Sequence, residues 1–217
     1  MSIKIILTGA TGFVGEGVLR TCLEHPEVAE VLMVNRRHFE LSHPKLRELL
    51  VPDFFTIEDY SHQLPGYDAC LFCAGISSVG MNEEKYTRIT YDTTLVVANL
   101  LSGLNPDMVF SFISGSHTDS SEKGKVMWAR VKGKTENALA KIPFKAQYNF
   151  RPGGMLPAAG QKNVKAMYVA IVKLLSWFIP KQILTLDEVG QAMINSVLKG
   201  YRKQTLEIAD IKELARS

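Results

Sequence analysis

Three glycines at intervals of three residues follow the first apolar run of the chain. Residues 3–7 read IKIIL, which is typical of a short buried parallel strand, and a helical pattern then continues to residue 23. Gly9, Gly12 and Gly15 therefore fall where a strand turns into a helix. At such a turn, free backbone N–H groups and the positive end of the helix dipole attract phosphate.

Each glycine has a separate role if a dinucleotide binds at this turn. Gly9 allows the tight turn, Gly12 lets the phosphates approach the backbone, and Gly15 lets the helix pack closely on the strand. A glycine triad alone is equally typical of a flexible loop, but the flanking strand and helix favour nucleotide binding. The cofactor-binding residues predicted here are Gly9, Thr11, Gly12, Phe13, Val14 and Gly15.

The residues after the second predicted strand indicate which dinucleotide binds. An NAD site usually has an acidic residue about 20 residues after the glycine turn, whereas residues 31–34 are followed by Asn35, Arg36 and Arg37. A guanidinium can pair with a ribose 2′-phosphate, which a carboxylate would repel. The sequence therefore favours NADP(H) over NAD(H), unless the two arginines are merely solvated surface charges.

Apolar runs alternate with helical patterns along the chain, which predicts a doubly wound, mainly parallel α/β sheet of the Rossmann type. Strands are expected at 3–8, 30–34, 48–51, 68–73, 108–113, 146–150 and 205–208. Helices are expected at 13–24, 83–102, 125–141, 162–178, 187–199 and 210–216. The polar segment 114–125 reads as a mobile loop.

Size and charge suit one domain over residues 1–217, with residues 151–217 on the substrate side. The net charge is +3 without a long basic run, so nucleic-acid binding is not indicated. The first strand leaves no room for a signal peptide, and the apolar stretch 167–179 is too short to span a bilayer. We therefore expect a cytoplasmic protein without a membrane span.

Two further groups of residues lie at strand ends. Asp53 with Phe54 follows the third strand, where the carboxylate can accept a hydrogen bond from an adenine amine or simply cap a turn. Cys73, Ala74 and Gly75 end the fourth strand with small residues that suit a backbone close to a cofactor ribose.

The cysteines and one apolar helix have plain structural interpretations. Cys70 and Cys73 have CxxC spacing, but residues three apart on a strand point to opposite faces, so core packing is favoured and no metal site is expected. Helical spacing within 162–178 predicts a buried face, although Trp177, Phe178 and Ile179 can instead form an exposed patch for a partner or membrane surface. The residues of the predicted face are Met167, Tyr168, Ile171, Leu174, Leu175 and Phe178.

Several of these features together resemble the short-chain dehydrogenase/reductase superfamily, and most closely its extended and atypical NAD(P)-dependent epimerase/dehydratase-like branch. The resemblance rests on TGATGFVG, Asp53, Cys73-Ala74-Gly75, a serine-rich end to the fifth strand, Lys132 and Arg151-Pro152-Gly153. The segment VMWARVKGKTENAL is also similar to the atypical group that includes the human Tat-interacting protein.

The resemblance implies a Ser-Tyr-Lys site for hydride transfer, which this chain keeps only in part. Lys132 is expected to hold the nicotinamide ribose, and either Ser114 or Ser116 takes the place of the family's serine. Trp128 stands four residues before the lysine, where the family has tyrosine, and an indole cannot shuttle a proton as a phenol can. Thr90 stands where the family has asparagine. Trp128 can stack on the nicotinamide, shape a substrate pocket or simply pack.

The resemblance also places Arg151, Pro152 and Gly153 beside the nicotinamide, although a simple loop explains them equally well. The chain is then an NADP-dependent oxidoreductase or epimerase-like enzyme on an unknown small molecule, with Ser116, His117, a substrate group or water as the acid. The alternative is an NADPH-sensing or scaffold protein that has lost the chemistry, and a purely structural role is weaker still. A partner protein and a homodimer are left open.

Overall fold

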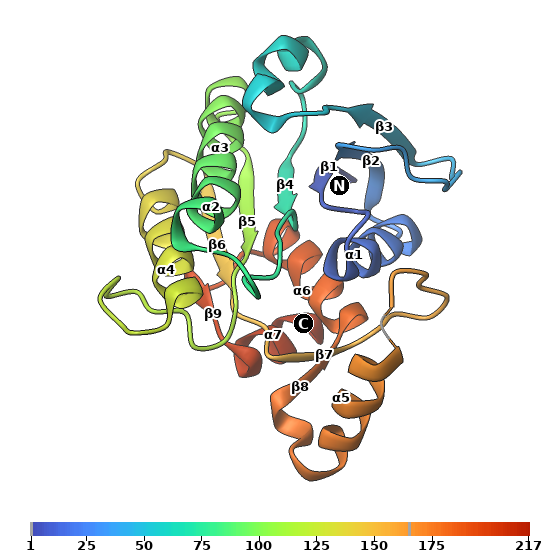
Figure 1. Ribbon diagram of the computed structural model, residues 1–217. Coiled ribbons are helices and arrows are strands. Elements are labelled where there is room, and N and C mark those ends of the chain that lie inside the picture. The colour runs from blue at the N-terminus through green and yellow to red at the C-terminus, as the bar shows by residue number, and fades with distance from the viewer. Residues whose placement is uncertain (1, 165) are drawn as a thin grey trace.

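A seven-stranded parallel sheet organises the computed structural model, which describes residues 2–164 and 166–217. The strand order is β3-β2-β1-β4-β5-β6-β9, and every neighbouring pair is parallel (Figure 1). The strands are β1 (Ile3–Thr8), β2 (Val28–Asn35), β3 (Leu46–Leu50), β4 (Ala69–Phe72), β5 (Val109–Ile113), β6 (Ala146–Phe150) and β9 (Thr205–Leu206). The predicted Rossmann-type α/β fold is confirmed.

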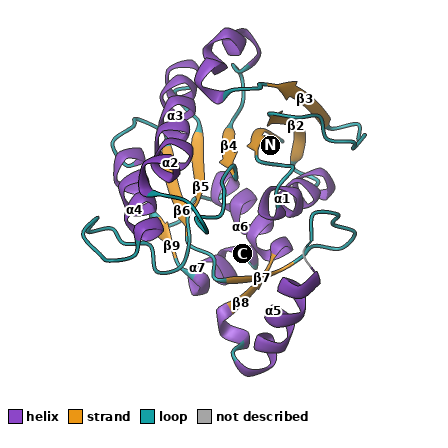
Figure 2. Cartoon of the chain, in the orientation of Figure 1, coloured by secondary structure: helices purple, strands orange, loops and turns teal. Residues whose placement is uncertain are grey.

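Helices cover both faces of this sheet, as Figure 2 shows. One face packs against α1 (Phe13–Glu24), α6 (Leu186–Leu198) and α7 (Ile208–Ala215). The other packs against η1 (Phe54–Gln63), α3 (Thr93–Leu104) and α4 (Met127–Leu139), with α2 (Glu83–Thr87) and η2 (Arg88–Asp92) leading into α3. The predicted helix 83–102 is thus three consecutive helical pieces, and η1 was not predicted.

Alternation along β1 explains why both faces need a cover. Ile5 and Leu7 are fully buried toward α1 and α6, while Ile6 is buried in the core on the other side. Because successive side chains of a strand point to opposite faces, the consecutive apolar residues 5–7 require helices on both sides of the sheet. Since these strands are parallel, the carboxyl ends of β1, β2, β4 and β5 lie at the same edge of the sheet.

A small second sheet lies beyond the end of the main one. β7 (Gly154–Leu156) pairs with β8 (Ile183–Thr185), and α5 (Ala166–Phe178) and η3 (Pro180–Gln182) project beside them (Figure 1). β7 and β8 were not predicted from the sequence. No helix within the two described ranges is both long and apolar enough to cross a bilayer.

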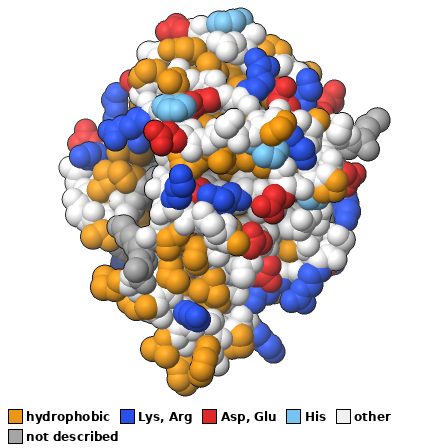
Figure 3. Space-filling model, turned by 90° about the vertical axis from the view of Figure 1, so that its right-hand side faces the viewer, with side chains coloured by type: hydrophobic (Ala, Val, Ile, Leu, Met, Phe, Trp, Pro, Cys, Tyr) orange, Lys and Arg blue, Asp and Glu red, His pale blue; other side chains and the backbone are white. Residues whose placement is uncertain are grey.

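The expectation that the apolar face of α5 is buried is wrong for the side chains that the structure describes. Met167, Ile171, Leu174 and Phe178 are all exposed, and Phe178 retains 75% of its accessible surface. The helix packs through the opposite side, where Val172 is buried beside Gly154 of β7. Figure 3 shows hydrophobic side chains gathered over this end of the molecule. The predicted positions Tyr168 and Leu175 lie outside the described side chains.

The polar segment 114–125 is held by hydrogen bonds rather than left free. The Asp119 carboxylate accepts hydrogen bonds from the backbone N–H groups of Ser121 and Gly124. From α4, Arg130 donates to the Gly124 carbonyl and Asn137 to the Ser120 carbonyl. These bonds hold the segment against α4, and its mobility stays a prediction.

Candidate cofactor and active site

The turn between β1 and α1 leaves no room for side chains at two of its three glycines. Gly9 has a positive φ of 75°, and a Cβ there would lie 2.6 Å from backbone atoms of Cys73 and Ala74. A Cβ on Gly15 would lie 2.1 Å from the Gly9 carbonyl oxygen. A Cβ on Gly12 would meet only that same oxygen, at 3.2 Å. Gly9 and Gly15 therefore shape the turn, while the surface at Gly12 stays open to a ligand.

The first turn of α1 can receive an anion. Gly12 is the N-cap residue in an extended conformation, and no side chain of the described residues caps this end. The Gly12 N–H donates to the Gly9 carbonyl, and the Glu16 N–H to the Gly12 carbonyl, so the turn is preformed. A capless helix start presents N–H donors and a positive dipole end, which suits a pyrophosphate.

A buried carboxylate ties this helix start to the segment that precedes α5. Glu16 is fully buried and accepts hydrogen bonds from the backbone N–H groups of Lys162 (2.7 Å) and Asn163 (2.8 Å), and from Arg20 (3.2 Å). Burial alone would raise the pKa of Glu16, but these hydrogen bonds outweigh it and lower the pKa. The Gln161 amide also donates to the Phe13 carbonyl.

A cavity of about 320 Å³ runs from the glycine turn to the end of β5. Nine predicted site residues line it: Gly12, Phe13, Val14, Cys73, Ala74, Gly75, Ser114, Lys132 and Pro152. Thr90 lines it as well, together with six residues that were not predicted: Ile76, Ser77, Tyr86, Phe112, Ile113 and Met155. The cavity thus joins residues of α1, α2, η2 and α4 with residues at the carboxyl ends of β4, β5 and β6.

Lys132 brings a cation into this cavity from α4. Its ammonium donates to the carbonyl oxygens of Ile113 (3.1 Å) and Ser114 (2.8 Å) and lies 5.6 Å from the centre of the Phe112 ring. Burial lowers the pKa of Lys132 to about 8, although nearby Glu136 opposes the shift. An ammonium with such a pKa can hold a ligand hydroxyl and also exchange a proton near neutral pH.

The two candidate serines occupy different environments. Ser114 is buried, lines the cavity and shares a 3.0 Å hydrogen bond with the Thr118 hydroxyl. Ser116 does not belong to the described lining, and its N–H donates to the Pro152 carbonyl. His117 is exposed and has a left-handed φ of 67°. Geometry therefore favours Ser114 as the hydroxyl that faces a ligand.

Trp128 and Tyr86 are two aromatic residues near this site whose polar hydrogens differ in acidity. The Trp128 ring lies over Gly115, where a Cβ would be 3.5 Å from it, and it is outside the described lining of the cavity. Tyr86, in α2, is buried and provides the only phenol among the described lining residues. Burial raises the pKa of Tyr86, which keeps its hydroxyl protonated. No sequence motif pointed to Tyr86.

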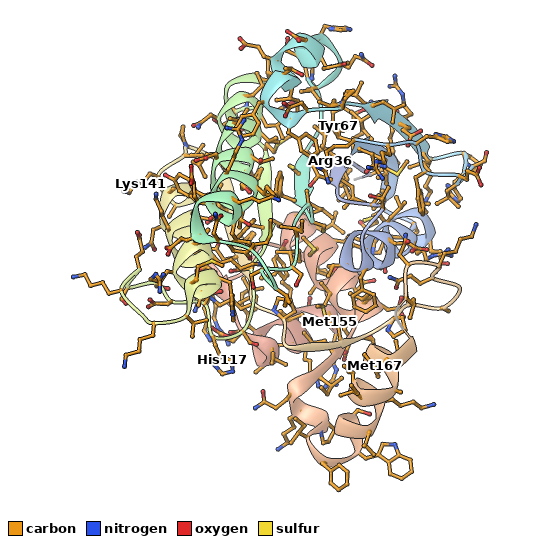
Figure 4. All side chains as sticks on the ribbon, viewed as in Figure 1. Arg36, Tyr67, His117, Lys141, Met155 and Met167 are labelled. Atoms are coloured by element: carbon orange, nitrogen blue, oxygen red, sulfur yellow. The ribbon has the colours of Figure 1, made fainter. Side chains whose placement is uncertain are left out.

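A second cavity, of about 150 Å³, shares Ala74, Gly75 and Ile76 with the first. Arg36 and Asp53 line it together with Arg88, whose guanidinium lies 4.8 Å from the centre of the Phe55 ring. Together the two cavities form a continuous strip along the sheet edge. Figure 4 labels Arg36, which lines the smaller cavity, and Met155, which lines the larger one. Arg88 was not predicted because it stands alone on a helical piece far from the glycine turn in sequence.

Some predicted residues lie apart from both cavities. Thr11 and Arg37 are exposed, and Asn35 is buried. Asp53, by contrast, lines the second cavity, and its carboxylate also accepts a hydrogen bond from the Phe55 N–H (3.0 Å) and so caps η1.

Arg151 and Gly153 face the body of the protein. The Arg151 guanidinium forms ion pairs with the Glu136 and Glu207 carboxylates and donates to the Ser120 hydroxyl. A Cβ on Gly153 would lie 2.8 Å from the side chain of Ile208. Both residues therefore support the turn after β6, from which Pro152 reaches the cavity.

The cysteines and acidic residues that the structure describes are not arranged as a metal site. Cys22 and Cys70 are buried, and burial raises the pKa of Cys22 to about 12 and that of Cys70 further still. Burial also raises the pKa of Cys73, so these thiols are poor nucleophiles. Within the described residues, no group of three or more His, Cys, Asp or Glu side chains is arranged to hold a metal ion.

Comparison with known proteins places this geometry among dinucleotide-binding folds. Residues 5–135 match the model of the NAD dependent epimerase/dehydratase family. No curated protein matches the chain.

Solved structures share the fold at low sequence identity. A UDP-N-acetylglucosamine 4-epimerase from Methanobrevibacter ruminantium M1, in complex with UDP-N-acetylmuramic acid, is 14% identical with a TM-score of 0.69, covering 94% of this chain and 75% of its own. WbmF from Bordetella bronchiseptica, in complex with NAD+, is 17% identical with a TM-score of 0.66, covering 99% and 77%. A uronate dehydrogenase from Agrobacterium tumefaciens is 13% identical with a TM-score of 0.68, covering 94% and 76%.

Proposed function

The chain belongs to the NAD dependent epimerase/dehydratase family, and on that premise we propose that it is an NADP(H)-dependent oxidoreductase or epimerase-like enzyme acting on a small molecule. One observation carries the proposal: two cavities share a wall and lead from Arg36 past the glycine turn to Lys132. A dinucleotide laid across the carboxyl ends of parallel strands needs this succession of sites. The closer likeness to the Tat-interacting protein group rests on residues 126–139 and stays a prediction.

The preference for NADP(H) rests on two guanidinium groups in the smaller cavity. Arg36 and Arg88 approach from different elements, and Phe55 supports Arg88 through its ring. Asp53 supplies the cavity's carboxylate and caps η1 through its hydrogen bond from the Phe55 N–H. Two cations that converge on one cavity favour a 2′-phosphate over a bare 2′-hydroxyl.

At the other end of the strip, the residues present fit a nicotinamide ribose. A Cβ on Gly75 would meet nothing within 4 Å, so the backbone between the two cavities has open space beside it. The bound cofactor would supply or accept a hydride. Lys132 would hold the ribose hydroxyls, and its proton, on an ammonium with a pKa of about 8, would pass to or from the substrate oxygen. Ser114 would orient that oxygen.

A calorimetric titration with NADPH and NADH tests the cofactor assignment. We expect tighter binding of NADPH, and a loss of about tenfold or more in NADPH affinity for Arg36→Ala and for Arg88→Ala. Arg37→Ala is the matched control, because Arg37 is an exposed neighbour outside the described lining of either cavity. Equal affinities for the two cofactors would remove the role of the arginines, and binding of neither would refute the proposal.

A second function, NADPH sensing without turnover, is favoured by Trp128 at the position where the family has tyrosine. Oxidation of NADPH with a panel of aldehydes, ketones and quinones separates the two functions. Turnover that Lys132→Met reduces while Trp128→Phe preserves would support the enzyme. Tight NADPH binding without turnover, together with partners that change between NADPH and NADP, would support the sensor.

A further inference from the structure

We propose that α5 and η3 form an interfacial anchor that lies on a membrane surface containing anionic phospholipids. The first evidence is a set of exposed apolar side chains at this end of the molecule. Trp177 is 81% exposed and Met167 79% exposed. We call this set the α5 patch, and it comprises Met167, Ile171, Leu174, Trp177, Phe178 and Ile179.

The α5 patch forms one continuous side of a projecting element. Met167, Ile171, Leu174 and Phe178 recur at intervals of three or four residues, so they lie along one face of the helix. Val172, on the opposite side, packs toward β7. The helix protrudes at the end of the molecule in Figure 1, and Figure 3 shows the hydrophobic surface there. The whole face can therefore meet a flat surface.

The charges around the α5 patch indicate which kind of surface the patch contacts. Residues 152–186 contain four lysines and neither aspartate nor glutamate. Among them, Lys162, Lys173 and Lys181 are exposed, and Lys212 of α7 donates to the Pro180 carbonyl beneath η3. A cationic rim around an apolar face that carries tryptophan complements anionic headgroups above an acyl layer.

Helix length decides between lying on a bilayer and crossing it. The 13 residues of α5 extend about 20 Å, which is shorter than a hydrocarbon core of about 30 Å. Such a helix lies in the interface plane with its apolar face down. This arrangement agrees with the cytoplasmic location expected from the sequence, since it requires no span.

The same charges oppose contact with a second copy of the chain. A two-fold contact between two α5 patches would bring the lysines around both patches, Lys173 and Lys181 among them, into one interface. Like charges across an interface are unfavourable, whereas phosphatidylserine headgroups would neutralise them. Charge therefore favours the lipid surface.

Vesicle flotation with the full chain and no added cofactor tests this proposal independently of the proposed function. We expect at least tenfold more protein on vesicles of 7:3 phosphatidylcholine and phosphatidylserine than on phosphatidylcholine alone. The double variant Trp177→Ser/Phe178→Ser should lose this binding at least tenfold. Its matched control is Val79→Ser/Val126→Ser, which removes two exposed apolar side chains elsewhere and should bind like the parent.

A second pair of variants tests the charge argument. Lys173→Gln/Lys181→Gln should lose the dependence on phosphatidylserine, whereas Lys123→Gln/Lys125→Gln, in an exposed loop far from α5 in sequence, should keep it. No binding to the anionic vesicles, or an equal loss in the control variants, would overturn the proposal. A dimer that Trp177→Ser/Phe178→Ser converts to a monomer, without vesicle binding, would assign the patch to contact between copies and also overturn it.

Discussion

The helices α1 and α5 have similar apolar periodicity but opposite environments. Val18 and Leu19 of α1 are fully buried between the sheet and α6. On α5, the apolar side chains at comparable spacing are exposed, and the buried contact that the structure describes is made through Val172. Periodicity therefore reports which side chains share a face, while a second element decides whether that face is covered.

The largest expected effect comes from a substitution in the first turn of α1, where a side chain would meet the backbone of the preceding glycine turn. Gly15→Ala places a Cβ 2.1 Å from the Gly9 carbonyl oxygen, which forces the backbone apart. We expect the free energy of unfolding to fall by about 3 kcal/mol and NADPH binding to be lost. Denaturant unfolding and calorimetry measure these effects. Gly103→Ala, where a Cβ meets nothing within 4 Å, is the control and should be neutral or stabilising.

The next largest effect is expected from the loss of the Glu16 carboxylate, which joins α1 to the segment before α5. Glu16→Gln keeps the shape but cannot accept all the hydrogen bonds of Glu16, and should cost about 2 kcal/mol. Because folding lowers the pKa of Glu16, its contribution is present above the ordinary pKa of 4.5 and is lost as pH falls through the folded value. The parent should thus lose more stability than the variant on acidification, and Glu58→Gln, at an exposed site, should behave like the parent.

A smaller effect is expected from Lys132 at alkaline pH. Its folded pKa of about 8 lies below the unfolded value of about 10.4. The unfolded chain therefore binds more protons in this window, and the free energy of unfolding should rise between pH 8 and pH 10. Lys132→Met should lack roughly 1–2 kcal/mol of that rise. Parallel pH profiles for parent and variant would refute the lowered pKa.

The smallest effect should come from the exposed face of α5. Phe178→Ser should change the free energy of unfolding by less than about 0.5 kcal/mol, because the ring is largely solvated already. Val172→Ser, on the buried side of the same helix, should cost about 2 kcal/mol. Similar costs for the two variants would mean that both faces are packed, and the comparison would fail.

Local rules predicted the turn and the main sheet but only part of the site. The glycine turn could be predicted because the positive φ of Gly9 and the close approach of Gly15 to the Gly9 carbonyl are constraints that are local in sequence. Tyr86 and Arg88 could not, since tertiary packing alone brings the helical pieces before α3 to the strand ends. The sequence left the exposure of Phe178 as an alternative to core packing, because hydrophobic spacing does not record what lies opposite a helix face.

The buried carboxylate of Glu16 has a mechanical consequence. It joins the first turn of α1 to the backbone at Lys162 and Asn163, just before α5 begins. Pulling these two segments apart would break the hydrogen bonds that Glu16 accepts from the backbone N–H groups of Lys162 and Asn163, and would leave Arg20 as the partner of its carboxylate. The projecting helix α5 and the first turn of α1 are therefore expected to move together, so that a force applied to α5 would be transmitted to the glycine turn.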